Sequence, residues 1–309
     1  MTLWSTTHVQ ADGVSLAVHR VGRGQPIVCL NAIGHNARDF DALAERIADR
    51  FELIAVEWPS HGQSGDDPSP GSAARYADLL VICLDQLALD APILLGNSIG
   101  GSAGMIYASR RPIRGLVLCS SGGLVEITPL VKRITRAQRD FFAAGERGAW
   151  WFGAGFWLMY HLILTERPAA KQRRAIIAGG RGRARIFKQL WASFGEPSAD
   201  LRDLAAKLEV PIWAAWASKD ITVPLRFCLP AIKRFRQGTL STFKCGHAAF
   251  LERPDEFAAE LLVFADRLEA GRRDAGRVLS GQDPVGKGRL PVLRSTPDDW
   301  YDRSVSRAG

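Results

Sequence analysis

The sequence predicts an α/β fold: a mostly parallel sheet with helices on both faces. Seven short apolar runs bounded by turn residues are typical of strands. Between several of them lie segments with apolar residues at helical spacing. Near-continuous apolar strands that alternate with helices indicate a sheet buried on both sides.

The elements follow in order along the chain. Strands are expected over residues 15–21, 26–32, 51–59, 91–98, 113–121, 211–218 and 238–245. Helices are expected over residues 38–50, 73–89 and 254–269. The alternation stops after residue 121, and residues 124–200 show helical stretches without a strand-like run. This pattern predicts a core of residues 1–123 and 201–271, with a helical insertion of residues 124–200 between two strands.

The last segment, residues 272–309, differs from the rest in composition. Gly, Pro, Arg and Asp occur throughout it with little periodicity. We expect an extended or disordered tail, with Trp300 and Tyr301 as candidate anchors against the body.

Composition excludes several classes of protein. The chain has 309 residues, 47% of them hydrophobic and 23% charged, which excludes disorder of the whole. It holds no run of about 18 apolar residues, as a membrane-spanning helix would need, and no visible secretory signal, so a cytoplasmic location is expected. Its five cysteines are odd in number and scattered, which favours buried free thiols over disulfides or a metal site.

Positive charge is concentrated in one part of the chain. Lys and Arg outnumber Asp and Glu by 40 to 32, a net charge of +8, and residues 125–195 alone hold thirteen bases against four acids. Such a block can attract nucleic acid, an anionic membrane surface or an acidic substrate. A solvated helical face is the simpler interpretation. Nucleic acid is not expected because no recognition motif is present, and a membrane surface is open but not favoured.

A Gly-x-Ser-x-Gly motif at residues 96–100 carries the strongest functional signal. It follows an apolar run and precedes a helix-like stretch, which is the context that gives the motif meaning. A serine on so sharp a turn has a strained backbone, and side chains two residues away on either side would collide. The following helix directs N–H groups at the reacting centre. Ser98 is the candidate nucleophile.

A serine hydroxyl needs a base, and the base needs an orienting carboxylate. Among six histidines, His247 alone combines an end-of-strand loop, a preceding glycine and a following helix. Asp220 comes directly after the run 211–218, again at the end of a strand. Glu126 is a rival for the carboxylate, a few residues past the strand that ends at Ser121. The predicted catalytic residues are Ser98, Asp220 and His247.

With these motifs in this order, residues 10–270 resemble the α/β-hydrolase fold enzymes. Residues 57–64, Val223-Pro224 and Glu252-Arg253-Pro254 resemble the family's turn after the fourth strand, its acid loop and its histidine loop. The resemblance implies an eight-stranded sheet, a cap formed by the insertion, and ester-like acyl transfer without cofactor or metal. Serine at the nucleophile position of this turn, Ser98, argues against haloalkane dehalogenases and epoxide hydrolases, which use a carboxylate nucleophile.

One loop departs from the family pattern. Members usually carry His-Gly after the third strand, where this chain has Asn31-Ala32-Ile33. By position, the backbone N–H groups of Ile33 and Ile99 are the expected oxyanion donors. Asn31 could offer its side-chain amide to the substrate or have a purely structural role in the turn.

The insertion offers the clue to the substrate. Large rings lie where a cap would cover the site, which indicates a small to medium apolar ester as substrate. Packing of these rings onto the body is the alternative. The candidate substrate-binding residues are Asn31, Trp150, Trp151, Phe156, Trp157 and Tyr160.

Other functions stay open. The sequences Gly96–Gly101 and Lys244–His247 are similar to carbon–carbon hydrolases of aromatic meta-cleavage products, although Ala248 stands where that group usually has Trp. Amidase, lactonase, thioesterase and peroxidative activities are further alternatives. A hydrolase-like receptor with slow turnover is favoured by the altered loop at Asn31-Ala32. Carboxylesterase activity is the preferred prediction. The sequence does not fix the oligomeric state.

Overall fold

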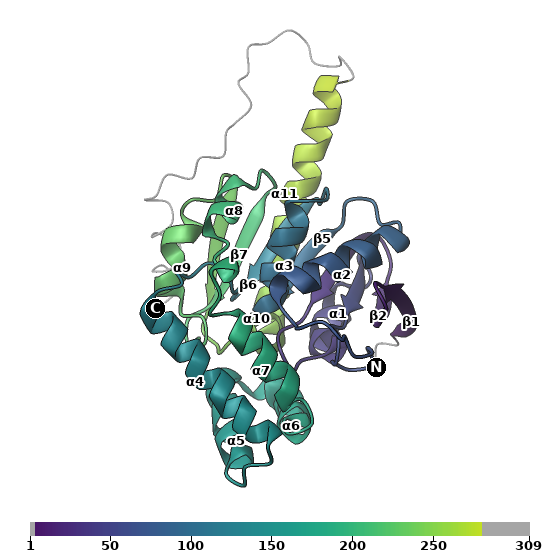
Figure 1. Ribbon diagram of the computed structural model, residues 1–309. Coiled ribbons are helices and arrows are strands. Elements are labelled where there is room, and N and C mark those ends of the chain that lie inside the picture. The colour runs from purple at the N-terminus through teal and green to yellow at the C-terminus, as the bar shows by residue number, and fades with distance from the viewer. Residues whose placement is uncertain (1–3, 280–309) are drawn as a thin grey trace.

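The computed structural model describes residues 4–279 and contains one eight-stranded sheet (Figure 1). The strand order is β1-β2-β4-β3-β5-β6-β7-β8. β1 and β2 pair antiparallel, as do β2 and β4, and the remaining neighbours pair parallel. The strands are β1 (Ser5–Ala11), β2 (Val14–Gly22), β3 (Gln25–Leu30), β4 (Phe51–Val56), β5 (Ile93–Asn97), β6 (Gly115–Cys119), β7 (Ile212–Ala217) and β8 (Gly238–Phe243).

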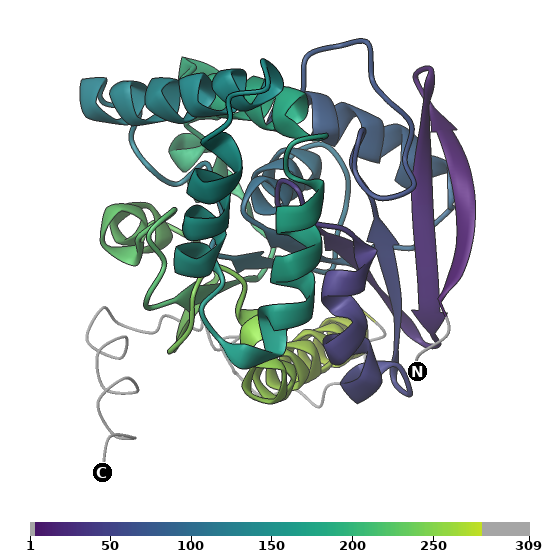
Figure 2. The ribbon, with the colours of Figure 1, turned by 90° about the horizontal axis from the view of Figure 1, so that it is seen from below.

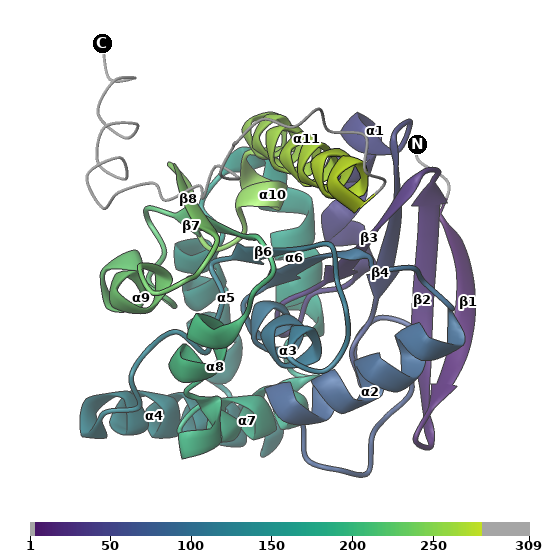
Figure 3. The same cartoon turned by 90° about the horizontal axis from the view of Figure 1, so that it is seen from above.

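Helices cover both faces of the sheet, which confirms the predicted fold class. In Figure 3, α1, α10 and α11 lie on one face and α2, α3 and α8 on the other. The core helices are α1 (Asp41–Ile47), α2 (Ala73–Gln86), α3 (Ile99–Ala108), α8 (Arg202–Lys207), α9 (Leu225–Ile232), α10 (Ala249–Glu252) and α11 (Pro254–Leu279). β5, β6 and β7 are buried along their whole length, as their uninterrupted apolar sequences predict.

The seven predicted strands all form, and their ends differ from the prediction by at most three residues. The strand that residue patterning missed is β1, at the edge of the sheet. Its sequence, Ser-Thr-Thr-His-Val-Gln-Ala, is polar, and only Val9 and Ala11 are buried. It is held by pairing with β2 through a two-residue turn, Asp12-Gly13, in which both residues have positive φ.

Two predicted segments differ from the structure. The helix expected over residues 38–50 is divided into a 3₁₀ turn (Ala37–Phe40) and α1, which ends at Ile47. The Asn36 side chain caps the start of the 3₁₀ turn by accepting from the Arg38 N–H. The predicted tail from residue 272 is wrong at its start, because α11 continues to Leu279. The rest of the tail, including Trp300 and Tyr301, lies outside the described residues.

The insertion between β6 and β7 is helical, as predicted, with no strand among residues 124–200. It consists of α4 (Pro129–Glu146), α5 (Phe152–Ile163), α6 (Ala170–Gly179) and α7 (Ala184–Ser193), with 3₁₀ turns at Arg167–Ala169 and Pro197–Ala199. Figures 1 and 2 show it gathered on one side of the molecule, beyond the ends of the strands.

The core is apolar and holds the thiols. All five cysteines are free and buried, as expected, and burial raises the pKa of each thiol. Within residues 4–279, no helix combines the length and hydropathy that a bilayer crossing requires.

Candidate active site

Ser98 lies on a strained turn between β5 and α3. Its backbone has φ 55° and ψ −118°, a conformation that is rare for a residue with a Cβ. The flanking glycines make the turn possible. A Cβ on Gly96 would lie 2.5 Å from the carbonyl carbon of Gly100, and one on Gly100 would lie 2.2 Å from the Leu30 oxygen. The glycines of the motif are therefore required by the close approach of backbone to backbone.

His247 and Asp220 form a buried pair. His247 Nδ1 lies 2.7 Å from Asp220 Oδ2, and the other carboxylate oxygen accepts from the N–H groups of Thr222 (2.7 Å) and Val223 (3.0 Å). Because an ionised carboxylate only accepts, Nδ1 carries the proton and Nε2 is left as the basic nitrogen.

The two members of the pair shift each other's pKa. Burial alone would raise the pKa of Asp220, but His247 and the two backbone N–H groups lower it below its ordinary value. Burial alone would lower the pKa of His247, but the Asp220 charge and hydrogen bond raise it above its ordinary value. The carboxylate therefore stays ionised and strengthens the imidazole as a base.

The histidine loop is bonded to the turn that holds Ser98. The Asn97 side-chain amide donates to the carbonyl of His247 (3.1 Å) and to that of Cys119 (2.9 Å). On the other side, the His247 N–H donates to the Ile163 carbonyl at the end of α5 (2.8 Å). Three segments far apart in the sequence, at residues 97, 163 and 247, are joined at this point.

The other candidates for base and acid lie elsewhere. Glu126 is exposed and pairs with Arg202 at 3.3 Å, so it is not the partner of His247. His8 and His161 form hydrogen bonds with backbone carbonyls near the surface. His19 pairs with Glu57, and His35 pairs with Asp39. His61 forms hydrogen bonds only with backbone groups.

The loop after β3 forms a tight turn. The His35 N–H donates to the Ala32 carbonyl (3.3 Å), and Gly34 has φ +78°, the positive φ that a type II turn needs at its third position. The Asn31 amide donates to the same carbonyl (3.0 Å), a bond that stabilises the turn, and its contact with substrate stays a prediction. Within residues 4–279, neither the Ile33 N–H nor the Ile99 N–H donates to another group of the protein.

One side of the insertion touches this loop. The Tyr160 hydroxyl donates to the Ile33 carbonyl (3.1 Å). A Cβ on Gly34 would lie 2.3 Å from Phe187 Cζ, so the Phe187 ring presses on the turn. Phe156 is buried and packs on the Tyr160 ring with the centroids 4.8 Å apart. The expected substrate-binding residues Phe156 and Tyr160 therefore lie on the side that faces the site.

The expected tryptophans of the insertion lie differently. Trp150 is 89% exposed, Trp151 41% and Trp157 52%. Trp157 packs on His161, its neighbour one turn along α5, with the ring centroids 4.0 Å apart. The structure does not enclose these three rings between the insertion and the core, and their contact with substrate stays a prediction.

Comparison with known proteins shows the family of this chain. The profile of the alpha/beta hydrolase family matches residues 27–260, about three quarters of the chain. The chain belongs to this family. The match spans the strained serine turn, Asp220 and His247.

Several hydrolases are similar to this alpha/beta hydrolase. A pimeloyl-[acyl-carrier protein] methyl ester esterase of Neisseria meningitidis is 26% identical over 304 residues, covering 90% of this chain and 86% of the relative. A 2-(acetamidomethylene)succinate hydrolase of Mesorhizobium japonicum is 31% identical over 127 residues, 40% of this chain and 43% of the relative. An esterase structure from Exiguobacterium antarcticum superposes with a TM-score of 0.73 at 20% identity, covering 85% of this chain and all of that one, a likeness of fold.

His61 has a role in this alpha/beta hydrolase that residue patterning missed. Its Nδ1 donates to the Pro59 carbonyl (2.9 Å), and its Nε2 accepts from the Gly34 N–H (2.9 Å). Burial is the main cause that lowers the pKa of His61 to about 4, so the ring is neutral and can accept. His61 holds the turn that presents the Ile33 N–H, a role that only the packing of two distant loops reveals.

Glu252 is a second residue of this kind. It is buried, and its carboxylate accepts from the N–H groups of Gly246 (3.2 Å) and Ala248 (3.2 Å), on either side of His247. It also accepts from the N–H groups of Thr165 (2.7 Å) and Glu166 (2.9 Å), just after α5. The carboxylate thus ties the histidine loop to the insertion. The Glu-Arg-Pro motif was the sequence signal for it.

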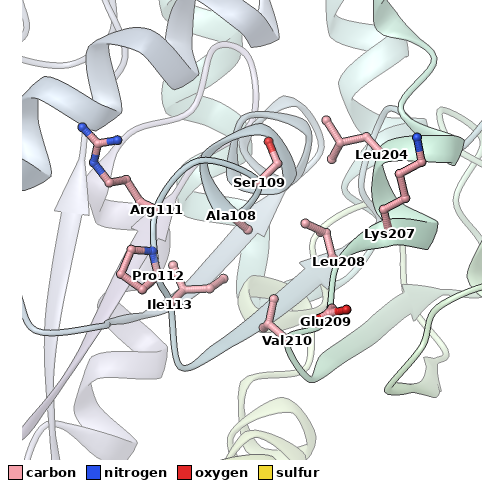
Figure 4. Close-up of a pocket in the computed structure, with 10 residues that line it drawn as sticks. All are labelled: Ala108, Ser109, Arg111, Pro112, Ile113, Leu204, Lys207, Leu208, Glu209 and Val210. Carbon is pink, nitrogen blue, oxygen red and sulfur yellow. The ribbon is translucent and has the colours of Figure 1, made fainter.

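A separate groove lies at the amino ends of β6 and β7 (Figure 4). Arg111, Pro112 and Ile113 line it just before β6, and Leu204, Leu208 and Val210 line it just before β7. Ser98 and Asp220 follow the carboxyl ends of their strands, so the groove is remote from them. Among the described residues, no group of three or more His, Cys, Asp or Glu side chains is arranged to hold a metal ion.

Proposed function

We propose that this alpha/beta hydrolase is a serine carboxylesterase that cleaves an ester of a small to medium apolar substrate. The observation that carries the proposal is the buried His247–Asp220 pair at 2.7 Å, hydrogen-bonded through Asn97 to the strained turn of Ser98. A nucleophile, a base and an orienting carboxylate are the three groups that acyl transfer to serine needs.

The reaction has two steps. The Ser98 oxygen attacks the ester carbonyl while His247 Nε2 takes the hydroxyl proton, and Asp220 stabilises the imidazolium. The imidazolium returns the proton to the departing alcohol as the acyl–oxygen bond breaks. Water then gives its proton to His247, attacks the acyl-enzyme and releases the acid, after which Ser98 recovers its proton. No cofactor takes part.

The oxyanion is proposed to bind the N–H groups of Ile33 and Ile99. Both are free of protein acceptors within residues 4–279, and Ile99 begins helix α3, whose amino end carries partial positive charge. Each such donor stabilises the transition state by roughly 3 kcal/mol. The Tyr160 and His61 hydrogen bonds to the same loop support a fixed position for the first donor.

The substrate class is proposed from the inner side of the insertion. Tyr160 and Phe187 contact the loop after β3, and the rings of Phe142, Phe152 and Phe156 pack behind them, so the groups of the insertion that reach this loop are aromatic. Aromatic walls favour an apolar acyl or alcohol group. The similarity to an esterase that acts on a methyl ester supports the same bond type.

The test is the variant Ser98→Ala, assayed with p-nitrophenyl esters of increasing chain length. We expect kcat to fall by about 10⁴ to 10⁶ while the thermal unfolding midpoint is retained. Near-normal turnover in a folded variant would refute the assignment of the nucleophile.

Carbon–carbon hydrolysis is the second candidate function. The elbow sequence, residues 96–101, and the segment Lys244–His247 favour it. Ala248, where that group usually has Trp, is buried and leaves no indole at this position. Incubation with a vinylogous 1,5-diketone dienoate decides between the two, because a carboxylesterase leaves the absorbance of that compound unchanged.

A further inference from the structure

The outer side of the insertion exposes large apolar side chains. Half of the ten exposed large apolar residues within the described part of the chain fall between residues 150 and 162. We call these five the outer apolar patch: Trp150, Trp151, Trp157, Leu158 and Leu162, which are between 41% and 89% exposed. Single exposed apolar residues are ordinary, whereas a contiguous group marks an interaction site.

Helix α5 explains why the patch exists. Phe152, Phe156 and Tyr160, at helical spacing, point inward and are buried. The opposite side, where a surface helix would be polar, carries Leu158 and Leu162 instead. None of the twelve residues of α5 is Asp, Glu, Lys or Arg. A helix that is apolar on both sides needs an apolar environment on its outer side as well as on its inner one.

Basic residues lie on the segments next to the patch. Five exposed bases, which we call the basic rim, flank α5 in sequence or lie on the turn before α6, on α6 itself or just after it: Arg147, Arg167, Lys171, Arg174 and Arg181. The Arg181 guanidinium donates to the Ala149 carbonyl, next to Trp150. Figure 2 shows α5 and α6 side by side on the face turned toward the viewer.

The rim is not neutralised by acids of the protein. Each of the four acids in residues 125–195 forms an ion pair with another base: Glu126 with Arg202, Asp140 with Arg139, Glu146 with Lys188, and Glu166 with Lys219 and Arg253. Within residues 4–279, no rim residue forms an ion pair with a carboxylate. The surface therefore combines exposed Trp and Leu with uncompensated positive charge.

We propose that the outer apolar patch and the basic rim bind the surface of an anionic phospholipid membrane. Trp and Leu side chains on one side of a helix enter the boundary between headgroups and acyl chains, and neighbouring Lys and Arg pair with anionic headgroups. Electrostatic complementarity favours anionic lipid over an uncharged apolar partner. The inner side of α5 holds Tyr160 on the loop of the candidate site, so the bound insertion lies between that loop and the lipid.

The test is co-sedimentation of the full chain with phosphatidylcholine vesicles, with and without about 30 mol% phosphatidylglycerol. We expect binding to the anionic vesicles only, and loss of binding when salt is raised from about 0.15 M to about 1 M. Two double variants should each lower the lipid partition coefficient about tenfold. One is Trp157→Ala/Leu158→Ser, in the patch, and the other is Lys171→Gln/Arg174→Gln, in the rim. Circular dichroism checks that these surface variants fold.

Phe227→Ala is the matched control, because Phe227 on α9 is as exposed as Trp157, at 52%. It should bind vesicles as the wild type does. The proposal is overturned if wild type does not sediment with anionic vesicles, or if the insertion variants bind as well as Phe227→Ala. Light scattering tests the alternative partner, a second copy of the chain. The patch would be assigned to that interface if the wild type is a dimer that does not bind vesicles and the Trp157→Ala/Leu158→Ser variant is a monomer.

Discussion

The contact between Phe187 and the turn at Gly34 can be tested by adding a single methyl group. In Gly34→Ala the new Cβ would lie 2.3 Å from Phe187 Cζ, at a position with φ +78°. Either the ring or the turn must move. Since the same turn carries the Ile33 N–H, movement of the turn displaces a proposed oxyanion donor.

The structure offers a matched control at Gly13. This residue has φ +79°, and a Cβ placed there meets nothing within 4 Å. The left-handed conformation costs an alanine about 1–2 kcal/mol, and the stiffer unfolded chain offsets about 0.4–1 kcal/mol of that cost. Gly13→Ala should therefore lose roughly 1 kcal/mol. Gly34→Ala carries the same cost plus overpacking against Phe187, about 1–3 kcal/mol more.

Urea denaturation and p-nitrophenyl ester hydrolysis measure the two effects. We expect Gly34→Ala to lower kcat about tenfold to a hundredfold, because displacing one oxyanion donor costs less than losing it outright, about 10² to 10³, while Gly13→Ala keeps the wild-type kcat. Adding Phe187→Leu to Gly34→Ala relieves the clash, so the double variant should lose less free energy of unfolding than the sum of the single variants. Equal losses of stability and kcat in Gly13→Ala and Gly34→Ala would refute the reasoning.

Two further predictions concern the histidine loop. Because Asp220 raises the pKa of His247, catalysis should fall below a pH at or above the ordinary histidine value of about 6.5, and Asp220→Asn should lower kcat about 10⁴-fold and move this limb to lower pH. Protonated His247 attracts the Asp220 carboxylate, so this pair stabilises the fold fully below the ordinary histidine pKa, and the contribution is lost as the pH rises through the raised pKa of folded His247. The free energy of unfolding lost in Asp220→Asn should therefore be larger at pH ~6 than at pH ~9. A pH-independent loss would contradict the pairing. Glu252→Gln places an amide donor among backbone N–H groups and should cost about 3 kcal/mol in urea denaturation. Glu252→Gln should also lower kcat about tenfold with little change in KM. The control Glu260→Gln, at an exposed position, should change neither the stability nor kcat. If folded Glu252→Gln keeps the wild-type kcat, Glu252 does not position the catalytic histidine.

Much of the fold follows from local sequence. The strands β5, β6 and β7 are buried on both faces, so their residues are almost all apolar and are visible as short runs. The turn at Ser98 is equally visible because part of its constraint is local: a Cβ on Gly96 would lie 2.5 Å from the carbonyl carbon of Gly100, four residues away. The need for glycine at position 100 comes instead from the Leu30 carbonyl of β3, which only folding brings close. In contrast, β1 is polar and is stabilised by its partner strand, so patterning does not detect it.

The partners of each side chain were decided by the tertiary structure. Residue order favoured Asp220 and kept Glu126 as a rival. In the structure β7 lies beside β8, Asp220 after β7 pairs with His247 after β8, and Glu126 pairs with Arg202. Aromatic composition likewise indicated that the insertion covers the site, but it did not show which rings face inward. A helix buries the rings on one side and exposes those on the other, and the folded structure decides which side is inner. Backbone strain and hydrophobic periodicity act between near neighbours in the chain and can be read there. Hydrogen bonds such as those of His61 and Glu252 join residues that only folding brings together, so they can be read only from the folded protein.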